Sequence, residues 1–456
     1  MNAHPAMRGG RAGHGFAAAC GLALISAIWP CQIAIATQVD TYIAQGKDAV
    51  SLRQFKEGEA AFRRGLELEP GHPEALYGAG YCALQQGKFS KALADLENVL
   101  RGTYATPAFR SFHMLALSRI GEIRLARKEY KAASEVYAQG VKNDPKSAEF
   151  RYGWGVALRA QGRNELALEQ FEEALKLDPK SAGSLIGKAA IYYELGNVPE
   201  AFRLLEQAES AAPANPLPYG VMSGFYRDMK KPMEHHLALG HYYFYAGNLQ
   251  RAANEYRTAQ AIKETPESHH VLGAAYLQLG QLSEAEAQLR QALKMKIEPA
   301  ETTWAQLSRV LARGGKLGEA DQALDKAIAL NKKVPAFEGQ RAWIRILQGR
   351  FDEADKLARS AIERDAAAAA PYRYLGDSLS ARGRFKDAID AYEKSLARDP
   401  TQSDVYVNLG WAFESTGDPV SAQRNYEFFL RASPTADEAR DVRAQLNKLK
   451  KKQRKP

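Results

Sequence analysis

The chain has 456 residues, of which 45% are hydrophobic and 25% are charged, and it contains 20 prolines. The length exceeds one ordinary core, and the composition excludes an intrinsically disordered chain. The formal net charge of +9 is concentrated at the two ends, with two positive charges before residue 37 and six in the tail Asn447–Pro456, which has no acid. The body between them carries only +1, which argues against a nucleic-acid-binding surface.

The first 36 residues have the three parts of a secretory signal peptide. Arg8 and Arg11 form a basic start, and an uncharged apolar run follows at Phe16–Ile28. The segment ends in Ala34-Ile35-Ala36, with small residues at the two positions that a signal peptidase recognises. We therefore predict cleavage after Ala36 and a periplasmic or secreted protein.

The alternative for this leader is an uncleaved anchor that runs from Phe16 to Ala36. Pro30 and Gln32 argue against it, because a membrane span requires about 20 continuous apolar residues. After cleavage only one cysteine, Cys82, remains, so an internal disulfide is excluded for the exported chain.

Beyond the leader, one pattern of residues recurs. FEEALKLDPKSA begins at Phe171, YEKSLARDPTQS begins at Tyr392, and FRRGLELEPGHP begins at Phe62. Their separations fit a period of about 34 residues with two insertions, and such periods are typical of arrays of one supersecondary unit. Alignment at this period gives eleven units between Val39 and about Ala436.

Each unit is predicted to form two antiparallel helices. In the unit that begins at Ala148, Gly155 lies in the first helix, Gly162 in the turn, and Ala167 and Phe171 in the second helix. Small residues allow two helices to approach closely, a large residue one turn later fills the space beside the crossing, and a turn glycine ends the first helix. Because one hairpin cannot bury its apolar face alone, stacking of units must supply the core.

The units fall into two groups along the chain. Residues 37–215 hold units one to five, and residues 233–436 hold units six to eleven. Between them, residues 216–232 are predicted as an irregular extra segment or a lone helix. The third unit departs from the pattern, because Lys128 replaces the turn glycine and seven extra residues precede the unit. Residues 437–456 are predicted to form a polar capping helix and a basic tail.

This pattern resembles the tetratricopeptide repeat family, and the resemblance covers about 400 residues. It implies an all-α fold, a right-handed superhelical α-solenoid of about eleven helix-turn-helix repeats. In this family the first helices line the concave side, where partners bind. Carried over by alignment, the partner-binding residues on that side are aromatic or basic side chains of the kinds that dominate binding energy. They are Tyr77, Tyr81, Tyr152, Arg159, Tyr193, His241, Phe244, Tyr245, Arg309, Arg313, Trp343, Arg373 and Trp411.

Each of these side chains equally suits a packing role between repeats, since single exposed aromatic residues need no functional explanation. Some members of the family bind the C-terminal carboxylate of chaperones through an asparagine that follows the mid-helix glycine. None of the eleven residues at that position is asparagine here. The resemblance therefore does not extend to this activity.

Histidines gather in the sixth and seventh units. His241 and His270 fall on inward positions of neighbouring units, which is compatible with a metal pair, whereas His236 and His269 share one packing position. The sequence contains no HExxH or similar ligand spacing, no nucleophile motif and no glycine-rich phosphate loop after a strand. We therefore predict no catalytic residues, no metal site and no cofactor.

Together these observations predict an exported, non-catalytic scaffold that binds protein partners in its concave groove. The resemblance implies a role in the bacterial cell envelope, in the assembly of a secretion, pilus or exopolysaccharide system. The alternative is a glycan-binding periplasmic module for polysaccharide export, because the same aromatic side chains stack on sugar rings. Membrane contact is expected only through the leader or the basic tail, whose charges would give weak, salt-sensitive binding.

Overall fold

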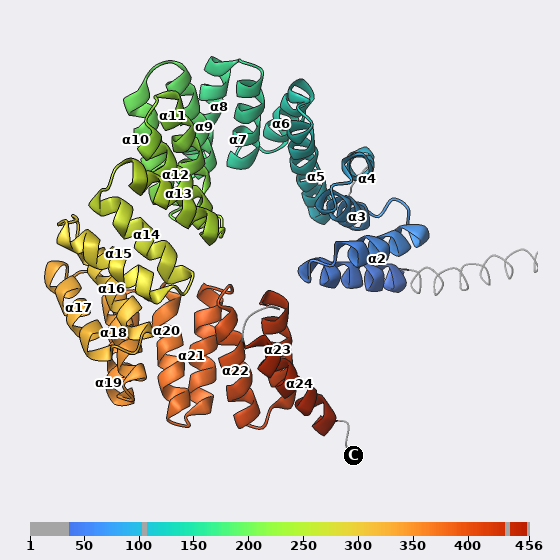
Figure 1. Ribbon diagram of the computed structural model, residues 1–456. Coiled ribbons are helices and arrows are strands. Elements are labelled where there is room, and N and C mark those ends of the chain that lie inside the picture. The colour runs from blue at the N-terminus through green and yellow to red at the C-terminus, as the bar shows by residue number, and fades with distance from the viewer. Residues whose placement is uncertain (1–35, 103–106, 434–437, 454–456) are drawn as a thin grey trace, which may run out of the picture. The chain divides into compact units, whose positions relative to one another are not determined.

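The computed structural model describes residues 36–102, 107–433 and 438–453. These residues form α-helices joined by short turns and contain no β-strand (Figure 1). The composition favours this result, because Ala, Leu, Glu, Lys and Arg are strong helix formers. Prolines stand at helix starts, as Pro73 and Pro335 do, where the missing N–H costs no hydrogen bond. The predicted signal peptide lies outside the described residues, apart from Ala36.

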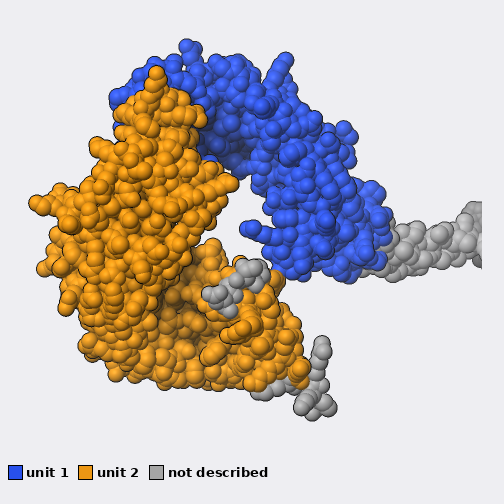
Figure 2. All heavy atoms as spheres, in the orientation of Figure 1, with its two compact units in different colours: residues 1–218 blue, residues 219–456 orange. Residues whose placement is uncertain are grey.

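The chain forms two compact units, residues 1–218 and 219–456 (Figure 2). In its described part, unit 1 begins with a helix through residues 36–51. Its later helices are α2 (Phe55–Leu68), α3 (Pro73–Gln85), α4 (Phe89–Arg101), α5 (Pro107–Ala126), α6 (Tyr130–Asn143), α7 (Ala148–Ala160), α8 (Asn164–Leu177), α9 (Ala182–Glu194) and α10 (Val198–Ala211).

Helix α11 (Leu217–Asp228) begins two residues before the boundary, and its residues from Tyr219 onward belong to unit 2. The other helices of unit 2 are α12 (Pro232–Tyr245), α13 (Leu249–Ile262), α14 (Pro266–Gln278), α15 (Leu282–Lys294), α16 (Glu301–Arg313), α17 (Leu317–Leu330), α18 (Pro335–Leu347), α19 (Phe351–Arg364), α20 (Ala369–Ala381), α21 (Phe385–Arg398), α22 (Ser403–Ser415), α23 (Pro419–Ala432) and α24 (Ala439–Gln453).

Within each unit the helices pair as hairpins, and each hairpin stacks on the next. Helix α7 packs on α8, for example, and α8 then packs on α9, which opens the following hairpin. This arrangement confirms the predicted all-α solenoid of helical hairpins. We call α3, α5, α7, α9, α12, α14, α16, α18, α20 and α22 the first helices, and the helix that follows each of them a second helix.

One close approach recurs in the hairpins, where a large side chain of the second helix lies between small residues. Phe171 on α8 is fully buried and lies between Gly155 on α7 and Gly187 on α9. A methyl group on Gly155 would stand 2.6 Å from Cε1 of Phe171, closer than carbon atoms normally approach. The same contact joins Gly240 to Tyr256, Gly376 to Tyr392 and Gly410 to Tyr426.

Helix ends inside the hairpins share one turn. In the α7–α8 turn, Gly162 has φ 75° and the Arg163 N–H donates to the carbonyl oxygen of Leu158 at 3.0 Å, which closes the helix end. Lys128 adopts the same left-handed conformation in the α5–α6 turn, with φ 60°. The turn therefore persists where glycine is missing, although a side chain makes this conformation costly.

The segment 216–232, predicted as an irregular extra segment or a lone helix, contains the regular helix α11. A turn of the hairpin type joins α11 to α12, with Lys230 at φ 57°. Near the point where the two helices meet, Ser223 Oγ lies 2.9 Å from His235 Nδ1. Helix α11 is thus one arm of a hairpin whose other arm is α12.

Helix α12 also forms the usual hairpin with α13, in which Gly240 receives Tyr256. It therefore serves as the second helix of one hairpin and the first helix of the next.

The seven extra residues before the third unit lengthen one helix. They lie where α5 begins, and α5 has 20 residues where α7 has 13.

The C-terminal helix α24 covers the last hairpin. Val442, Leu446 and Leu449 are buried and belong to one apolar cluster with residues of α23. Lys450 Nζ forms an ion pair with Glu427 at 2.8 Å, so part of the basic charge of this region is neutralised within the fold. Among the described helices, none has the length and apolar character to cross a membrane.

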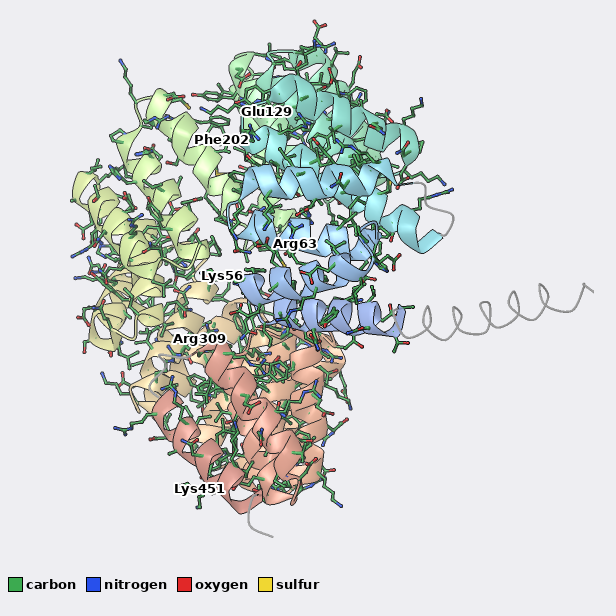
Figure 3. All side chains as sticks on the ribbon, turned by 90° about the vertical axis from the view of Figure 1, so that its right-hand side faces the viewer. Lys56, Arg63, Glu129, Phe202, Arg309 and Lys451 are labelled. Atoms are coloured by element: carbon green, nitrogen blue, oxygen red, sulfur yellow. The ribbon has the colours of Figure 1, made fainter. Side chains whose placement is uncertain are left out.

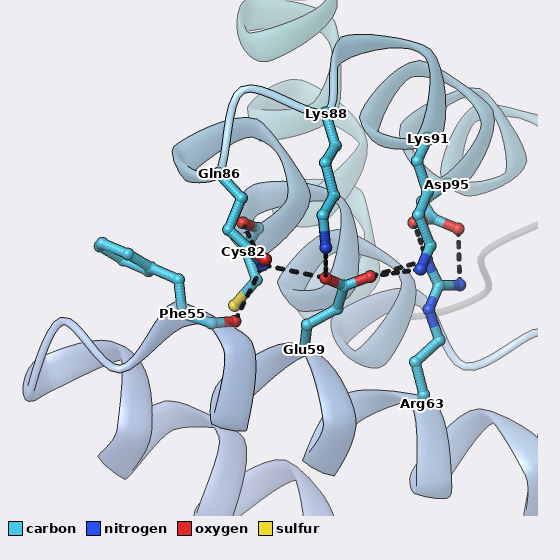
Figure 4. A network of polar contacts seen from close by, with 8 residues as sticks. All are labelled: Phe55, Glu59, Arg63, Cys82, Gln86, Lys88, Lys91 and Asp95. Carbon is cyan, nitrogen blue, oxygen red and sulfur yellow. Dashed lines mark hydrogen bonds and ion pairs between the residues drawn. The ribbon is translucent and has the colours of Figure 1, made fainter.

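A polar network around Glu59 joins α2, α3 and α4 (Figure 4). Glu59 is only 6% exposed, and its carboxylate accepts hydrogen bonds from Gln86 Nε2 at 2.9 Å and Lys88 Nζ at 3.2 Å. Lys91 Nζ lies 2.5 Å from its second oxygen. Burial alone favours the neutral acid, but these hydrogen bonds and the charge of Lys91 outweigh burial and lower the pKa of Glu59 to about 2.

Replacing Gly155 by Ala is expected to lower the free energy of unfolding by about 1–3 kcal/mol, because the methyl group must displace Phe171 from a packed core. Urea unfolding followed by circular dichroism measures the change. Gly318 in α17 is the matched control, since it is exposed and a Cβ there meets no atom within 4 Å. Equal losses for Gly155→Ala and Gly318→Ala would contradict the steric explanation.

The low pKa of Glu59 makes its contribution to stability depend on pH. The folded pKa is depressed, so the contribution is complete above the unfolded value of about 4.5 and is lost as pH falls toward 2. Replacing Glu59 by Gln should cost about 1–3 kcal/mol of unfolding free energy at pH 7. The difference in unfolding free energy between wild type and variant should shrink as pH falls from 4.5 to 2. Urea unfolding at a series of pH values measures this difference. A difference that stays constant with pH would contradict the low pKa of Glu59.

Candidate functional site

The predicted residues of unit 1 are largely engaged with their neighbours. Tyr77 and Tyr81 on α3 stack with ring centroids 6.3 Å apart, and Phe112 on α5 lies 5.8 Å from Tyr77. Tyr152 on α7 packs against Phe171, with ring centroids 6.2 Å apart. The rings of the three tyrosines and of Phe112 are partly buried, and that of Phe171 is fully buried. All of them therefore contribute to contacts between repeats.

Two further predicted residues of unit 1 lie at the C-terminal ends of first helices. Arg159 on α7 forms an ion pair with Glu194 on α9, with Nη2 and Oε1 2.6 Å apart. Tyr193, one residue before this glutamate, is partly buried. The charge of Arg159 is therefore already matched within the fold.

In unit 2, helix α11 changes the surroundings of the predicted residues on α12. Tyr219 on α11 stacks on Tyr245, with ring centroids 5.2 Å apart, and lies 5.1 Å from the ring of His241. His241 Nδ1 also lies 3.0 Å from the hydroxyl oxygen of Tyr256, and burial lowers the pKa of His241 to about 4. Phe244 is partly buried in the same apolar cluster. His241 and Phe244 thus belong to a packed aromatic junction, whereas Tyr245 at its edge is 38% exposed.

The remaining predicted residues lie on four first helices of unit 2. On α16, the exposed or partly exposed positions Thr302, Gln306, Arg309 and Arg313 follow one stripe. The residues between them are buried, apart from the partly buried Trp304. Figure 3 labels Arg309 on this helix. Helix α18 packs on both α16 and α20, and α20 packs on α22, so equivalent stripes on the four helices are neighbours. We call these stripes of α16, α18, α20 and α22 the inner face.

Trp343 and Trp411 occupy equivalent positions on α18 and α22 of the inner face. Trp343 is partly buried, because it packs against the apolar cluster between α16 and α18. Trp411 is 64% exposed, the largest fraction among the large aromatic side chains of the described residues. Its indole is thus held on a rigid helix and remains available to a partner.

Between the two tryptophans, a polar network joins α20 to α22. Asp377 Oδ1 accepts hydrogen bonds from the hydroxyl of Tyr392 at 2.9 Å and from Asn408 Nδ2 at 3.0 Å. Arg373 Nη1 lies 2.7 Å from Asp404, and its Nε lies 3.7 Å from Asp377. Burial raises the pKa of Asp377, and the charge of Arg373 together with the two hydrogen bonds opposes this shift.

The clustered histidines are bonded to protein groups: His236 to Glu255 at 2.7 Å, and His270 to Thr303 at 2.8 Å. Across the residues that the structure describes, there is no group of three or more His, Cys, Asp or Glu placed to hold a metal ion. What the inner face offers chemically is aromatic surface, arginine charge and hydrogen-bonding groups.

A separate cavity of about 510 Å³ lies between α19 and α21, on the side of the second helices. Leu375 and Leu379 of α20 belong to its lining. The guanidinium of Arg398 lies 3.9 Å from the ring centroid of Tyr372 there and donates to its hydroxyl at 2.9 Å. None of the predicted partner-binding residues lines this cavity.

Sequence reasoning missed several residues that shape the site. The available signal for a further hairpin was a spacing that α11 shares with α20. It joins Tyr219, Met222, Ser223 and Tyr226 on α11 and Tyr372, Leu375, Gly376 and Leu379 on α20. Asp377 and Asn408 had no comparable signal. Their partners come from the neighbouring helices, and nothing in the local sequence specifies those contacts.

Two family models match the chain. One is described as the C-terminal domain of cilia and flagella-associated protein 70 and matches residues 226–446. The other is described as a tetratricopeptide repeat and matches residues 43–108, 116–182 and 152–216. Together the matches cover both units, including most of the predicted repeats.

Curated relatives match only parts of the chain. They include the probable N-acetylglucosaminyltransferase SPINDLY of Solanum lycopersicum, 34% identical over 89 residues, which are 20% of this chain and 10% of the relative. Transcriptional regulator HilA of Salmonella typhimurium is 32% identical over 140 residues, 29% of this chain and 25% of HilA. Cellulose synthase operon protein C of Pseudomonas fluorescens is 25% identical over 170 residues, 35% of this chain and 13% of the relative. The chain thus spans a quarter or less of the length of each.

Two solved structures align with most of the chain, at low sequence identity and with TM-scores below 0.5. The crystal structure of the APC/C hetero-tetramer Cut9–Hcn1 matches with a TM-score of 0.47 and 13% identity, covering 91% of this chain and 98% of the other. Yeast Tom70 matches with a TM-score of 0.39 and 14% identity, covering 92% and 97%. The repeated hairpins, with their small and large residues at the crossings, and the family models that match both units identify the chain as a tetratricopeptide repeat protein.

Proposed function

We propose that this protein is a non-catalytic scaffold that binds a protein partner on the inner face of unit 2. Tetratricopeptide repeats form scaffolds for protein interaction. The exposure of the predicted residues indicates which part of the chain is available for a partner. The predicted aromatic residues of unit 1 and of α12 are partly buried in contacts between helices, with Tyr245 at 38% exposure as the most open. Trp411 is the observation that carries the proposal, because its indole is 64% exposed at the centre of a helix.

An exposed tryptophan on a rigid helix is a favourable anchor for a partner. Its neighbours Asp404 and Asn408 are held by hydrogen bonds and ion pairs to α20, so little side-chain entropy remains to be lost on binding. Tryptophan is enriched among residues whose truncation costs the most binding energy. A partner that packs an apolar side chain on this indole would also cover the polar network between α20 and α22.

A second candidate is glycan binding, since an exposed indole also stacks on sugar rings. The stretch of 170 residues that resembles cellulose synthase operon protein C supports testing this candidate. The two candidates differ in the chemistry that they require of the ligand. A protein partner uses the arginines and the polar network as well as the indole, whereas a sugar ring needs mainly Trp343 and Trp411.

We also propose that the protein is exported to the cell envelope of a bacterium, where it assists assembly of a secretion, pilus or exopolysaccharide system. The basis is the order of basic, apolar and small residues in the first 36 positions. Thr37 would then be the first residue of the mature chain, two residues before the core residue Val39 on the first described helix.

Replacing Trp411 by Ala is expected to remove the partner without unfolding the protein. Affinity capture from an envelope extract identifies the partner, and isothermal titration with the purified partner should show a loss of about 2 kcal/mol or more in binding free energy. Val420→Ala is the matched control, because Val420 is 73% exposed on the second helix α23. Unchanged affinity for Trp411→Ala would contradict the proposed surface. Glycan binding would be favoured instead if no protein is captured and the wild type is retained on cellulose. Both Trp343→Ala and Trp411→Ala should then abolish this retention.

Export is expected to leave a chain that begins at Thr37. Intact mass spectrometry of the protein recovered from the periplasmic fraction of an expressing bacterium checks this start. A substitution of Ala36 by a bulky residue should block cleavage, because the peptidase requires a small side chain there. Full-length mass in the membrane fraction of the wild type would contradict cleavage and favour an anchored protein.

A further inference from the structure

The four arginines predicted for the groove differ in how their charge is balanced. Arg159 is paired with Glu194 at 2.6 Å, and Arg373 is paired with Asp404 at 2.7 Å. Arg309 and Arg313 on α16 form no ion pair with any described residue. Arg313 Nη1 donates only to the carbonyl oxygen of Leu277, at 3.2 Å. The inner face therefore carries two unbalanced positive charges on one helix.

These two arginines lie on the same stripe of α16. They are four residues apart and exposed, whereas Leu307, Ser308, Val310 and Leu311 near them are buried. Side chains at this spacing are neighbours on a helix, with Cβ atoms about 6 Å apart. Because a guanidinium binds a carboxylate through two parallel hydrogen bonds, the pair can receive two carboxylates at a similar spacing.

An extended peptide supplies carboxylates at that spacing. Alternate residues of an extended chain point to the same side and lie about 7 Å apart. Two acidic residues separated by one other residue would therefore face Arg309 and Arg313 together. A neutral segment would leave both charges uncompensated in the interface.

The rest of the inner face suits the continuation of such a segment. Trp343 lies on α18, the first helix that follows α16. One turn before it, Gly339 faces the ring of Tyr374 on α20, and a Cβ at Gly339 would lie 3.8 Å from this ring. Beyond α20, Trp411 is exposed. A segment that follows α16 past the two arginines and then turns across the stripes toward α22 thus meets positive charge first and aromatic surface afterwards.

We propose that Arg309 and Arg313 bind the side-chain carboxylates of an acidic, extended segment of the protein partner, which continues over Trp343 toward Trp411. The proposal rests on the proposed function, in that it names the chemistry of the partner at the same site. It assigns specificity to α16 and apolar anchoring to α18 and α22. The recognised carboxylates belong to side chains, so the segment does not have to end the partner's chain.

The test uses the full exported chain and a random library of displayed peptides. Peptides enriched on the wild type should contain acidic residues at alternate positions together with an aromatic or aliphatic residue. Fluorescence polarisation with synthetic versions of these peptides should show that Arg309→Gln and Arg313→Gln each lower the affinity roughly fivefold or more. Raising the salt concentration should lower the affinity of the wild type by a similar factor. Arg359→Gln, an exposed arginine of the second helix α19, should bind as the wild type does.

Further outcomes separate this proposal from the proposed function. Enriched peptides that lose binding in Trp411→Ala but contain no acidic bias, or ignore the arginine substitutions, would overturn the role of α16 and leave the scaffold function standing. Peptides whose binding disappears when their C-terminus is amidated would show recognition of a terminal carboxylate, which also overturns the proposal. Enriched peptides that bind Trp411→Ala and both arginine variants as the wild type would remove the inner face as the site altogether.

Discussion

The steric constraint at the helix crossings supports the rest of this structure. Phe171 lies between Gly155 and Gly187, and the same arrangement of a ring against glycine recurs at Tyr256, Tyr392 and Tyr426. Each ring touches the first helix of its own hairpin, and Phe171 also touches the first helix of the next, so that it joins its hairpin to the stack. The apolar area of one hairpin is buried only when its neighbour is present, which makes the array cooperative along its length.

This packing also decides which side of a first helix is left for a partner. The small residue faces the second helix, and large apolar residues on either side of it face the adjoining hairpins. On α16 only the stripe that includes Arg309 and Arg313 remains exposed. The scaffold thus presents side chains at a fixed spacing on rigid helices, and a partner meets a surface that needs little rearrangement.

Charges on the inner face of unit 2 are organised by contacts between hairpins. Arg373 is held by Asp404 of the following hairpin, and Asp377 receives hydrogen bonds from Tyr392 and Asn408. These bonds join α20 to α21 and α22 and restrain the polar side chains beside Trp411. The arginines of α16 have no such neighbours among the described residues, and this difference separates side chains that stabilise the array from side chains available for recognition.

The sequence by itself determined the helices, the hairpins and their stacking, because the residues responsible are local and periodic. Glycine, alanine and a large apolar residue recur at one spacing, and helix ends follow from turn glycines and prolines. Tertiary structure decided the rest. Helix α11 was missed as a hairpin arm because Lys230 stands where glycine is usual, and the shared role of α12 breaks the period. Whether an arginine is paired depends on a carboxylate about one repeat away, as Glu194 is for Arg159, and such contacts form only when the hairpins stack.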